Sequence, residues 1–372
     1  MRKIDTRMHS VWVNGMVNDV IHDLKGNAAV QGGKRDSTVQ ALAALNERIG
    51  ELIEFEKYDP RKIADIKPKQ NYKIEREIEL ESRVNSLQAL EDGRILAGCS
   101  DGSIRIFNQG INSGGWSILD RIHRSPISRV QVLPQQKILF SGDARGAAII
   151  DYDSDAPALE TMELILKGND IKEVQALNSR TIVGVGLTPN LILFEKEADG
   201  RWKKLELRSH TSKILCIGHF DDGRLVTGSS DNTMKIWSKS SGSWGVESSI
   251  NCPGPVKCLQ VIAADHVLLA VNSRGICRYN LSEGDEVREV MDASGTIECM
   301  QVARNGTVYW GSYHLGISRP DGEEYEPAIK YAIKGVDNTM ESAKILCMHV
   351  LPDGRIITGH RNRIVVWDGE DA

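Results

Sequence analysis

Short apolar runs alternate with turn-forming residues along most of this chain. The runs are rich in isoleucine, valine and leucine and are only 4 to 6 residues long, which favours β-strands over helices. Asp-Gly pairs separate several of them, at residues 92–93, 222–223 and 353–354. These residue types tolerate the positive φ of a tight hairpin turn. The pattern predicts a chain built mainly of short antiparallel strands.

One arrangement of three such strands recurs seven times between residues 84 and 368. The clearest copy, His210 to Trp237, reads HTSKILCIGHFDDGRLVTGSSDNTMKIW, with a small residue near the end of its second strand. A fourth strand fits between copies, as in RWKKLELRSH (201–210). Four strands in about 43 residues are typical of a propeller blade. The equivalent first-strand positions, spaced by 43, 44, 43, 42, 41 and 48 residues, are Leu87, Val130, Val174, Ile217, Leu259, Met300 and Met348.

Seven copies predict an all-β fold, a seven-bladed β-propeller with four-stranded blades. Only six segments lie between the copies, so one outer strand must come from elsewhere in the chain. The stretch NYKIEREIELES (71–82) alternates apolar and polar residues as a strand does. We expect it to pair beside the C-terminal strands of the last copy, which would leave no open sheet edge at the seam.

The repeat resembles the WD-repeat family over residues 72–368, because Trp367-Asp368 matches the family's signature dipeptide and the Lys235–Trp237 stretch (KIW) is close to it. Most copies lack the family's Gly-His pair, and only one has Trp-Asp. The resemblance implies a scaffold in multiprotein assemblies. It also implies a structural hydrogen-bond set within one blade, formed by His210, Ser229, Asp231 and Trp237.

Residues 1–70 lack the repeat and are predicted to form an α-helical N-terminal arm and linker ahead of the propeller (71–372). The segment 37–57 has a heptad-like apolar stripe formed by Leu42, Leu45, Ile49 and Leu52. Two heptads are too few for a stable isolated coiled coil, so the stripe needs a partner surface. The partner is another helix of the arm, the side of the propeller, or another chain. That other chain would be a second copy, which would make the protein a homo-oligomer, or a binding partner.

Charge and cysteine usage narrow the function classes. The formal net charge is −5, which gives no electrostatic reason to expect a nucleic-acid partner. No run approaches the length of a membrane span, and no signal peptide is visible, so we expect a cytoplasmic protein. Four of the seven cysteines recur with the repeat, without a CxxC pair, and are interpreted as reduced core residues rather than metal ligands: Cys216, Cys258, Cys299 and Cys347. No cofactor is expected.

No catalytic motif is present: we find no P-loop, HExxH, GxSxG or helix-opening GxGxxG. His210, Ser229 and Asp231 have the residue types of a hydrolase triad. We favour the structural role for them, because a nucleophile also needs an oxyanion site and an open pocket. The protein is therefore predicted not to be an enzyme.

One propeller face is the candidate binding surface, because loops on a rigid scaffold concentrate function. It would bear the loops from outer to inner strands and from second to third strands. Arginine and aromatic residues, which dominate binding hot spots, gather in these loops. The candidates are Arg83, Arg124, Arg145, Arg274, Tyr313, His314, His360, Arg361 and Arg363. We expect them to dock an acidic or phosphorylated protein or peptide; the alternative is a solvated rim paired with Asp101, Asp143 and Asp231.

Two other functions stay open at this point. The first is an enzyme with a small-molecule site at the propeller axis, although the inner strands offer mainly glutamines, which are poor acid–base groups. Those glutamines are Gln88, Gln131, Gln175, Gln260 and Gln301. The second is a secreted microbial effector that occupies a host complex.

Overall fold

A computed structural model describes most of the repeat region. The described residues are 69–90, 92–107, 116–119, 125–142, 146–152, 163–166, 171–272, 274–284, 286–291, 296–303, 305–321, 324–332 and 343–371. The predicted helical arm, with Leu42, Leu45, Ile49 and Leu52, lies outside them.

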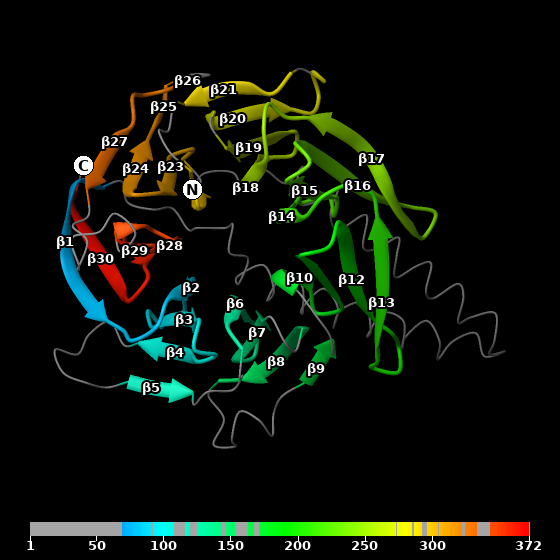
Figure 1. Cartoon of the computed structure of the whole chain (residues 1–372), viewed down its shortest axis with the longest axis horizontal. Helices are drawn as coiled ribbons and strands as arrows, with labels where there is room; N and C mark the ends of the chain where they lie inside the picture. The colour runs from blue at the N-terminus through cyan, green and yellow to red at the C-terminus, as the bar shows by residue number, and fades with distance from the viewer. Residues whose placement is uncertain are drawn as a thin grey trace, which may run out of the picture.

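Seven four-stranded antiparallel sheets surround a central axis, which confirms the predicted seven-bladed propeller (Figure 1). We number these blades 1 to 7 in chain order of their inner strands. Each blade runs from an inner strand near the axis to an outer strand at the periphery. A small two-stranded sheet, β25 (Pro320–Asp321) with β26 (Glu324–Tyr325), accompanies blade 6.

The strands of blades 1 to 7 follow in that order. The inner strands are β2 (Val84–Ala89), β6 (Ile127–Leu133), β10 (Ile171–Asn178), β14 (Ile214–His219), β18 (Val256–Ala263), β22 (Cys299–Val302) and β28 (Cys347–Val350). The second strands are β3 (Ile95–Cys99), β7 (Lys137–Gly142), β11 (Thr181–Gly186), β15 (Leu225–Ser229), β19 (His266–Val271), β23 (Val308–Gly311) and β29 (Ile356–Gly359). The third strands are β4 (Ile104–Phe107), β8 (Gly146–Asp151), β12 (Asn190–Lys196), β16 (Thr233–Ser240), β20 (Gly275–Asn280), β24 (His314–Ser318) and β30 (Arg363–Asp371). The outer strands are β5 (Trp116–Leu119), β9 (Glu163–Leu166), β13 (Trp202–Arg208), β17 (Ser243–Asn251), β21 (Arg288–Met291), β27 (Ile329–Ala332) and β1 (Lys69–Glu79).

The ring closes where the two ends of the repeat region meet. Strand β1 pairs antiparallel with β30, from Lys69 opposite Asp371 to Glu79 opposite Arg363, and supplies the outer strand of blade 7. Figure 1 shows this pair as blue beside red. The Tyr72 hydroxyl, buried in the interface with blade 6, donates to the Gly354 carbonyl at 2.9 Å. The predicted closure by an N-terminal strand is confirmed, with the strand beginning two residues earlier than expected.

A recurring Asp-Gly-Arg turn shapes the hairpins on one face. In blade 4 Gly223 has a φ of 88°, in the left-handed region that glycine tolerates. The Asp222 carboxylate accepts from the Arg224 backbone N–H at 3.0 Å and from its guanidinium Nε at 2.7 Å. The same clamp recurs at Asp92-Arg94, Asp199-Arg201 and Asp353-Arg355.

Neighbouring blades approach closely because a glycine ends several second strands. A Cβ atom built on Gly228 would lie 2.5 Å from Cγ1 of Val256, which is the first residue of the next inner strand. A Cβ atom built on Gly98 would lie 2.7 Å from Ile127, and one built on Gly359 would lie 2.8 Å from Val84. The small residue seen in each sequence copy is therefore a requirement of blade-to-blade packing.

Polar side chains of the inner strands also connect consecutive blades. The side-chain carbonyls of three glutamines accept from backbone N–H groups of the next blade: Gln88 from Val132 at 2.8 Å, Gln131 from Ala176 at 2.7 Å and Gln301 from Val350 at 2.8 Å. The cysteine thiols act similarly in other blades, with Cys216 donating to the Val256 carbonyl and Cys347 to that of Val84. All seven cysteines are free, and burial raises the pKa of those two thiols well above the usual value.

Replacing Gly228 with alanine should destabilise the propeller by about 1–3 kcal/mol, because the new methyl group overpacks the interface with blade 5. Urea unfolding of the full chain measures this difference. The matched control is Gly245→Ala on outer strand β17, where a Cβ would meet nothing within 4 Å. Equal stability of the two variants would contradict the packing argument.

Candidate functional site

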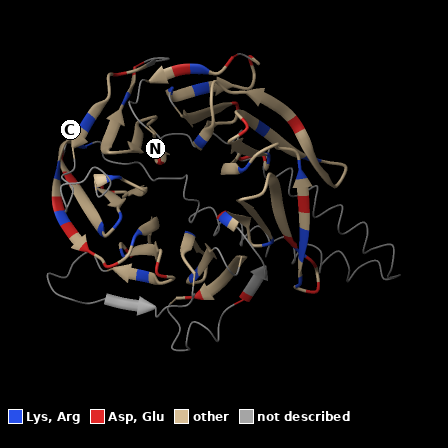
Figure 2. Cartoon of the chain, in the orientation of Figure 1, with Lys and Arg blue, Asp and Glu red and all other residues tan. Residues whose placement is uncertain are grey.

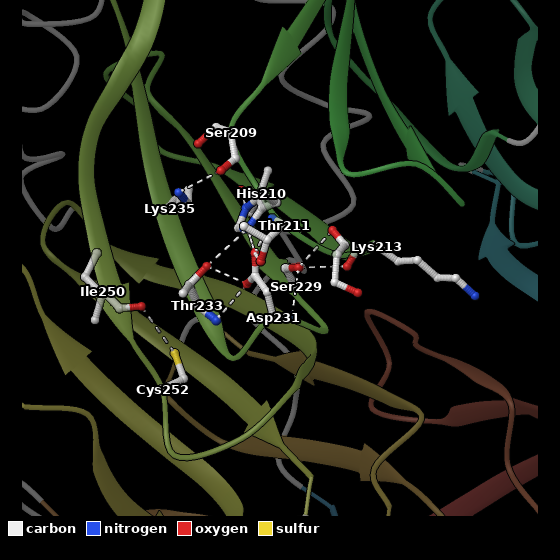
Figure 3. Close-up of polar contacts among 12 residues, drawn as sticks. Ser209, His210, Thr211, Lys213, Ser229, Asp231, Thr233, Lys235, Ile250 and Cys252 are labelled. Atoms are coloured by element: carbon white, nitrogen blue, oxygen red, sulfur yellow. Dashed lines mark hydrogen bonds and ion pairs between the residues drawn. The ribbon is translucent and has the colours of Figure 1, made fainter.

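A chain of hydrogen bonds joins Asp231, His210, Thr227 and Trp237 in blade 4. Figure 3 shows the part with His210 and Asp231. His210 pairs through Nδ1 with Asp231 Oδ2 at 2.9 Å and through Nε2 with Thr227 Oγ1 at 2.8 Å. The Trp237 indole N–H donates to the same threonine oxygen at 2.9 Å. Burial lowers the pKa of His210, and a neutral ring with its proton on Nδ1 matches this pattern. Burial opposes ionisation of Asp231, but hydrogen bonds from Thr233, Thr211 and His210 lower the pKa of its carboxyl overall.

In this hydrogen-bond chain, Thr227 joins His210 to Trp237, where the sequence had predicted Ser229. Thr227 and Ser229 point to the same side of β15, but Thr227 lies closer to Trp237, which is paired with Leu225. Ser229 lies at the strand end, where its hydroxyl donates to the Lys213 carbonyl at 2.8 Å. Its hydroxyl is thus hydrogen-bonded to the main chain. In a catalytic triad it would be hydrogen-bonded to the histidine.

Blade 7 builds a similar chain from a different histidine. Trp367 donates to Thr358 Oγ1 at 3.0 Å, and that hydroxyl contacts His360 Nε2 at 2.9 Å. His360 comes from the turn between β29 and β30 and is fully buried. Its prediction as a surface binding residue was wrong, because the imidazole turns inward to the threonine.

Arg363 is also absent from the surface. Its side chain is 3% exposed, and its guanidinium Nη1 contacts Glu77 Oε2 at 2.8 Å. Arg363 begins β30 and Glu77 belongs to β1, so the pair joins the two strands that close the ring. This arginine is part of the seam, and its prediction as a binding residue was wrong.

The other predicted binding residues fall into three groups. Arg83, Arg274 and Arg361 are exposed, and no ion pair ties any of them to a carboxylate of the described residues. Tyr313 and His314 are half-buried at the turn from β23 into β24. Arg124 and Arg145 lie outside the described residues.

A cationic ring that the sequence analysis missed lies at the beginnings of the inner strands. Each side chain comes from the last three residues before an inner strand or from its first three residues. Their recurrence near the first apolar residue of six of the seven copies is the signal that would have identified them. Figure 2 shows lysines and arginines on these inner parts of the blades, around the axis. We call this group the channel mouth: Arg83, Arg129, Lys172, Lys213, Lys257 and Lys344, with the carboxylates Glu173 and Glu298.

Ion pairs hold part of the channel mouth together across blades 5, 6 and 7. Glu298 accepts from Lys344 at 2.7 Å and from Lys257 at 3.1 Å. Burial opposes ionisation of Glu298, but the two ammonium groups lower its pKa overall. The Lys344 ammonium also lies 5.9 Å from the centre of the Tyr313 ring. On the other side, Arg129 stands 4.0 Å from Glu173, whose pKa is raised by burial. Six cations against two carboxylates leave the mouth positive.

The WD-domain, G-beta repeat family model matches the chain at residues 75–108 and 202–238, which fall in blades 7, 1, 3 and 4. The seven-bladed structure and these two stretches match the WD-repeat propeller family. No curated protein sequence matches the chain.

Solved structures share this seven-bladed fold. The WD40 β-propeller domain of Doa1 is similar with a TM-score of 0.65 and 15% identity, over 81% of this chain and 97% of that one. A chain of the mitotic checkpoint complex is similar with a TM-score of 0.65 and 15% identity, over 82% and 96%. WD40 propellers generally serve as scaffolds for protein interactions.

Within the described residues, no helix is long and apolar enough to span a membrane. Nor do three or more histidine, cysteine, aspartate or glutamate side chains of these residues gather closely enough to hold a metal ion.

Acid should destabilise the propeller through its buried histidines. Burial lowers the pKa of His360 from 6.5 to about 4, so between these values the unfolded chain binds the proton and the folded one does not. Stability should fall as the pH drops from about 6.5 to 4, and His360 should account for about 3 kcal/mol of the fall. His349, whose pKa burial also lowers to about 4, contributes similarly.

The measurement is urea unfolding of the full chain at several pH values in this window. The matched variant is His360→Gln, which has no titrating group and can donate to Thr358. The part of the pH-dependent loss that His360 supplies, about 3 kcal/mol, should disappear in it. An unchanged pH dependence would exclude His360 as a source.

Proposed function

We propose that this propeller is a non-catalytic adaptor that docks an acidic or phosphorylated segment of a partner protein at its channel mouth. The observation that carries the proposal is the positive charge of the mouth on a chain whose formal net charge is −5. A local field opposite in sign to the net charge steers anionic partners to one place on the surface.

The mouth has cations available for a ligand as well as cations already paired. Lys257 and Lys344 share Glu298, whereas Arg83 and Lys213 are exposed with no ion pair to a described carboxylate. In Figure 3 the Lys213 side chain extends away from the hydrogen-bonded chain of blade 4. Partner carboxylates or phosphates would supply the missing counter-charges.

The backbone that bears these cations is held rigidly. The Arg83 carbonyl accepts from the Ser100 N–H at 2.9 Å, and the Lys213 carbonyl accepts from the Ser230 N–H at 2.9 Å. Each bond ties the start of an inner strand to the turn that follows the second strand of the same blade. Preorganised cations lose little conformational entropy on binding, which favours affinity.

Apolar side chains on the same face would add specificity. Leu187, in the turn between β11 and β12, is 44% exposed. Tyr313 lies beside Lys344 in the turn from β23 into β24. Arg274 and Arg361, in the equivalent turns of blades 5 and 7, would form the outer part of the contact. The N-terminal arm as a second contact or oligomerisation element, and a cytoplasmic location, remain part of this proposal.

Charge reversal at the mouth tests the proposal. The double variant Arg83→Glu, Lys213→Glu should bind a fluorescein-labelled peptide of phosphoserine and glutamate about tenfold more weakly or worse, which is about 1.4 kcal/mol. Fluorescence anisotropy at low salt measures the affinity. Binding by the unaltered chain should weaken as salt is added, since exposed charges are screened.

The control variant Lys73→Glu, Lys203→Glu changes the net charge equally, but on outer strands β1 and β13. It should retain the affinity of the unaltered protein. A loss of equal size in both double variants would show that only net charge matters, and no loss in either would place the docking site elsewhere.

A further inference from the structure

We propose that residues 37–57 of this chain dock their apolar stripe in a groove on the side of the propeller, between the outer strands of blades 6 and 7. This inference is independent of the channel mouth. It assigns a surface to a stretch of the chain whose heptad-like pattern calls for an apolar partner.

The groove lies where strand β1 passes the outer part of blade 6. Its lining includes Lys69, Arg319, Glu326, Pro327, Ile329 and Tyr331. Its floor is firm, because Tyr331 meets the buried Tyr72 edge-on at 5.7 Å between ring centres. Arg319 ties the two blades together by donating to the Lys69 carbonyl at 3.4 Å.

Two exposed isoleucines mark this side of the molecule. Ile329 on β27 is 50% exposed and Ile74 on β1 is 39% exposed. Ile74 is paired with Trp367, which belongs to the same apolar cluster as Tyr72 and Ile317, so it faces blade 6. Exposed aliphatic side chains on two adjacent outer strands are the kind of surface that a helix or strand covers.

The connection to β1 favours this occupant. Strand β1 begins at Lys69, in the groove itself, and eleven residues, 58–68, separate it from the segment 37–57. Eleven extended residues span at most about 40 Å, which is enough for the segment to fold back onto the groove from which β1 starts. Among the described residues, the other large exposed apolar side chains, Leu187, Val246 and Ile262, belong to blades 3, 4 and 5, none of which adjoins β1 in Figure 1.

Charge complements the apolar contact. The segment 37–57 contains four glutamates against one arginine and one lysine, a net charge of −2. The charged residues that line the groove are Arg319, Glu326 and Lys69, and Lys69 already pairs with Asp368. Leu42, Leu45, Ile49 and Leu52 would cover Ile329 and Ile74, with a glutamate of the segment placed to pair with Arg319.

Site-directed cross-linking in the full chain tests this docking. The variant Leu45→Cys, Ile329→Cys, treated with a short bis-maleimide, should form an intramolecular cross-link in about tenfold higher yield than the control Leu45→Cys, Val246→Cys, because docking raises the effective concentration of the two thiols. Val246 is 40% exposed on an outer strand of blade 4. The native thiols interfere little, since burial raises the pKa of each of them and thiolate is the reactive form.

Mass spectrometry of the monomer and dimer bands reads the result. Equal yields for the two cysteine pairs would overturn the proposal, and so would cross-links found only between chains, which would mean that the segment binds a second copy. As a second measurement, Ile329→Glu should speed amide exchange across residues 37–57 about tenfold or more, whereas Val246→Glu should leave it unchanged. Equal exchange in both variants would also overturn the proposal.

Discussion

The contact between neighbouring blades is the constraint on which the rest of this structure depends. A four-stranded sheet has two apolar faces, and a blade can bury them only against the blades on either side. The end of one second strand must therefore come within van der Waals distance of the next inner strand. Glycine at positions such as 98, 228 and 359 makes room for the β-branched residue opposite. The inner-strand glutamines then satisfy backbone N–H groups that the next blade leaves free at the axis.

This packing also explains why lysine and arginine side chains recur at the channel mouth. Ile127, Val256 and Val84 each begin an inner strand and pack against the preceding blade, which fixes the start of the strand and the residues beside it. Positions 83 and 213, for example, form the same backbone bond to their own second-to-third-strand turns. A repeated structural position thus becomes a ring, and lysine or arginine at that position turns the ring into a charged one.

The repeat period was enough to predict the number of blades, the order of their strands and the closing strand, because all three follow from local strand pattern and counting. The hydrogen-bond chains were harder to predict from the sequence. Thr227 and Ser229 are both hydroxyl residues on one side of β15, and only the register with Trp237 separates them. His360 and Arg363 occur in a polar turn whose pattern is that of a surface loop. Whether such a side chain turns inward depends on its partner. Arg363 pairs with Glu77, which is far away in the sequence, whereas His360 contacts Thr358, only two residues before it. The ring of cations at the channel mouth could be identified only from the closed propeller, since its members come from six blades.

Blade 7 differs from the others because it is assembled from both ends of the repeat region. The aspartate of the signature dipeptide, Asp368, pairs with Lys69, and Arg363 pairs with Glu77, so two ion pairs cross the β1–β30 seam. Arg363 is buried, and a buried guanidinium that lost its carboxylate would be costly, which makes its pair depend on correct register. The strand that carries Lys69 and Glu77 is also the strand that leads from the N-terminal segment. A partner that binds that segment would therefore act first on the seam, where the paired strands β1 and β30 come from opposite ends of the repeat region.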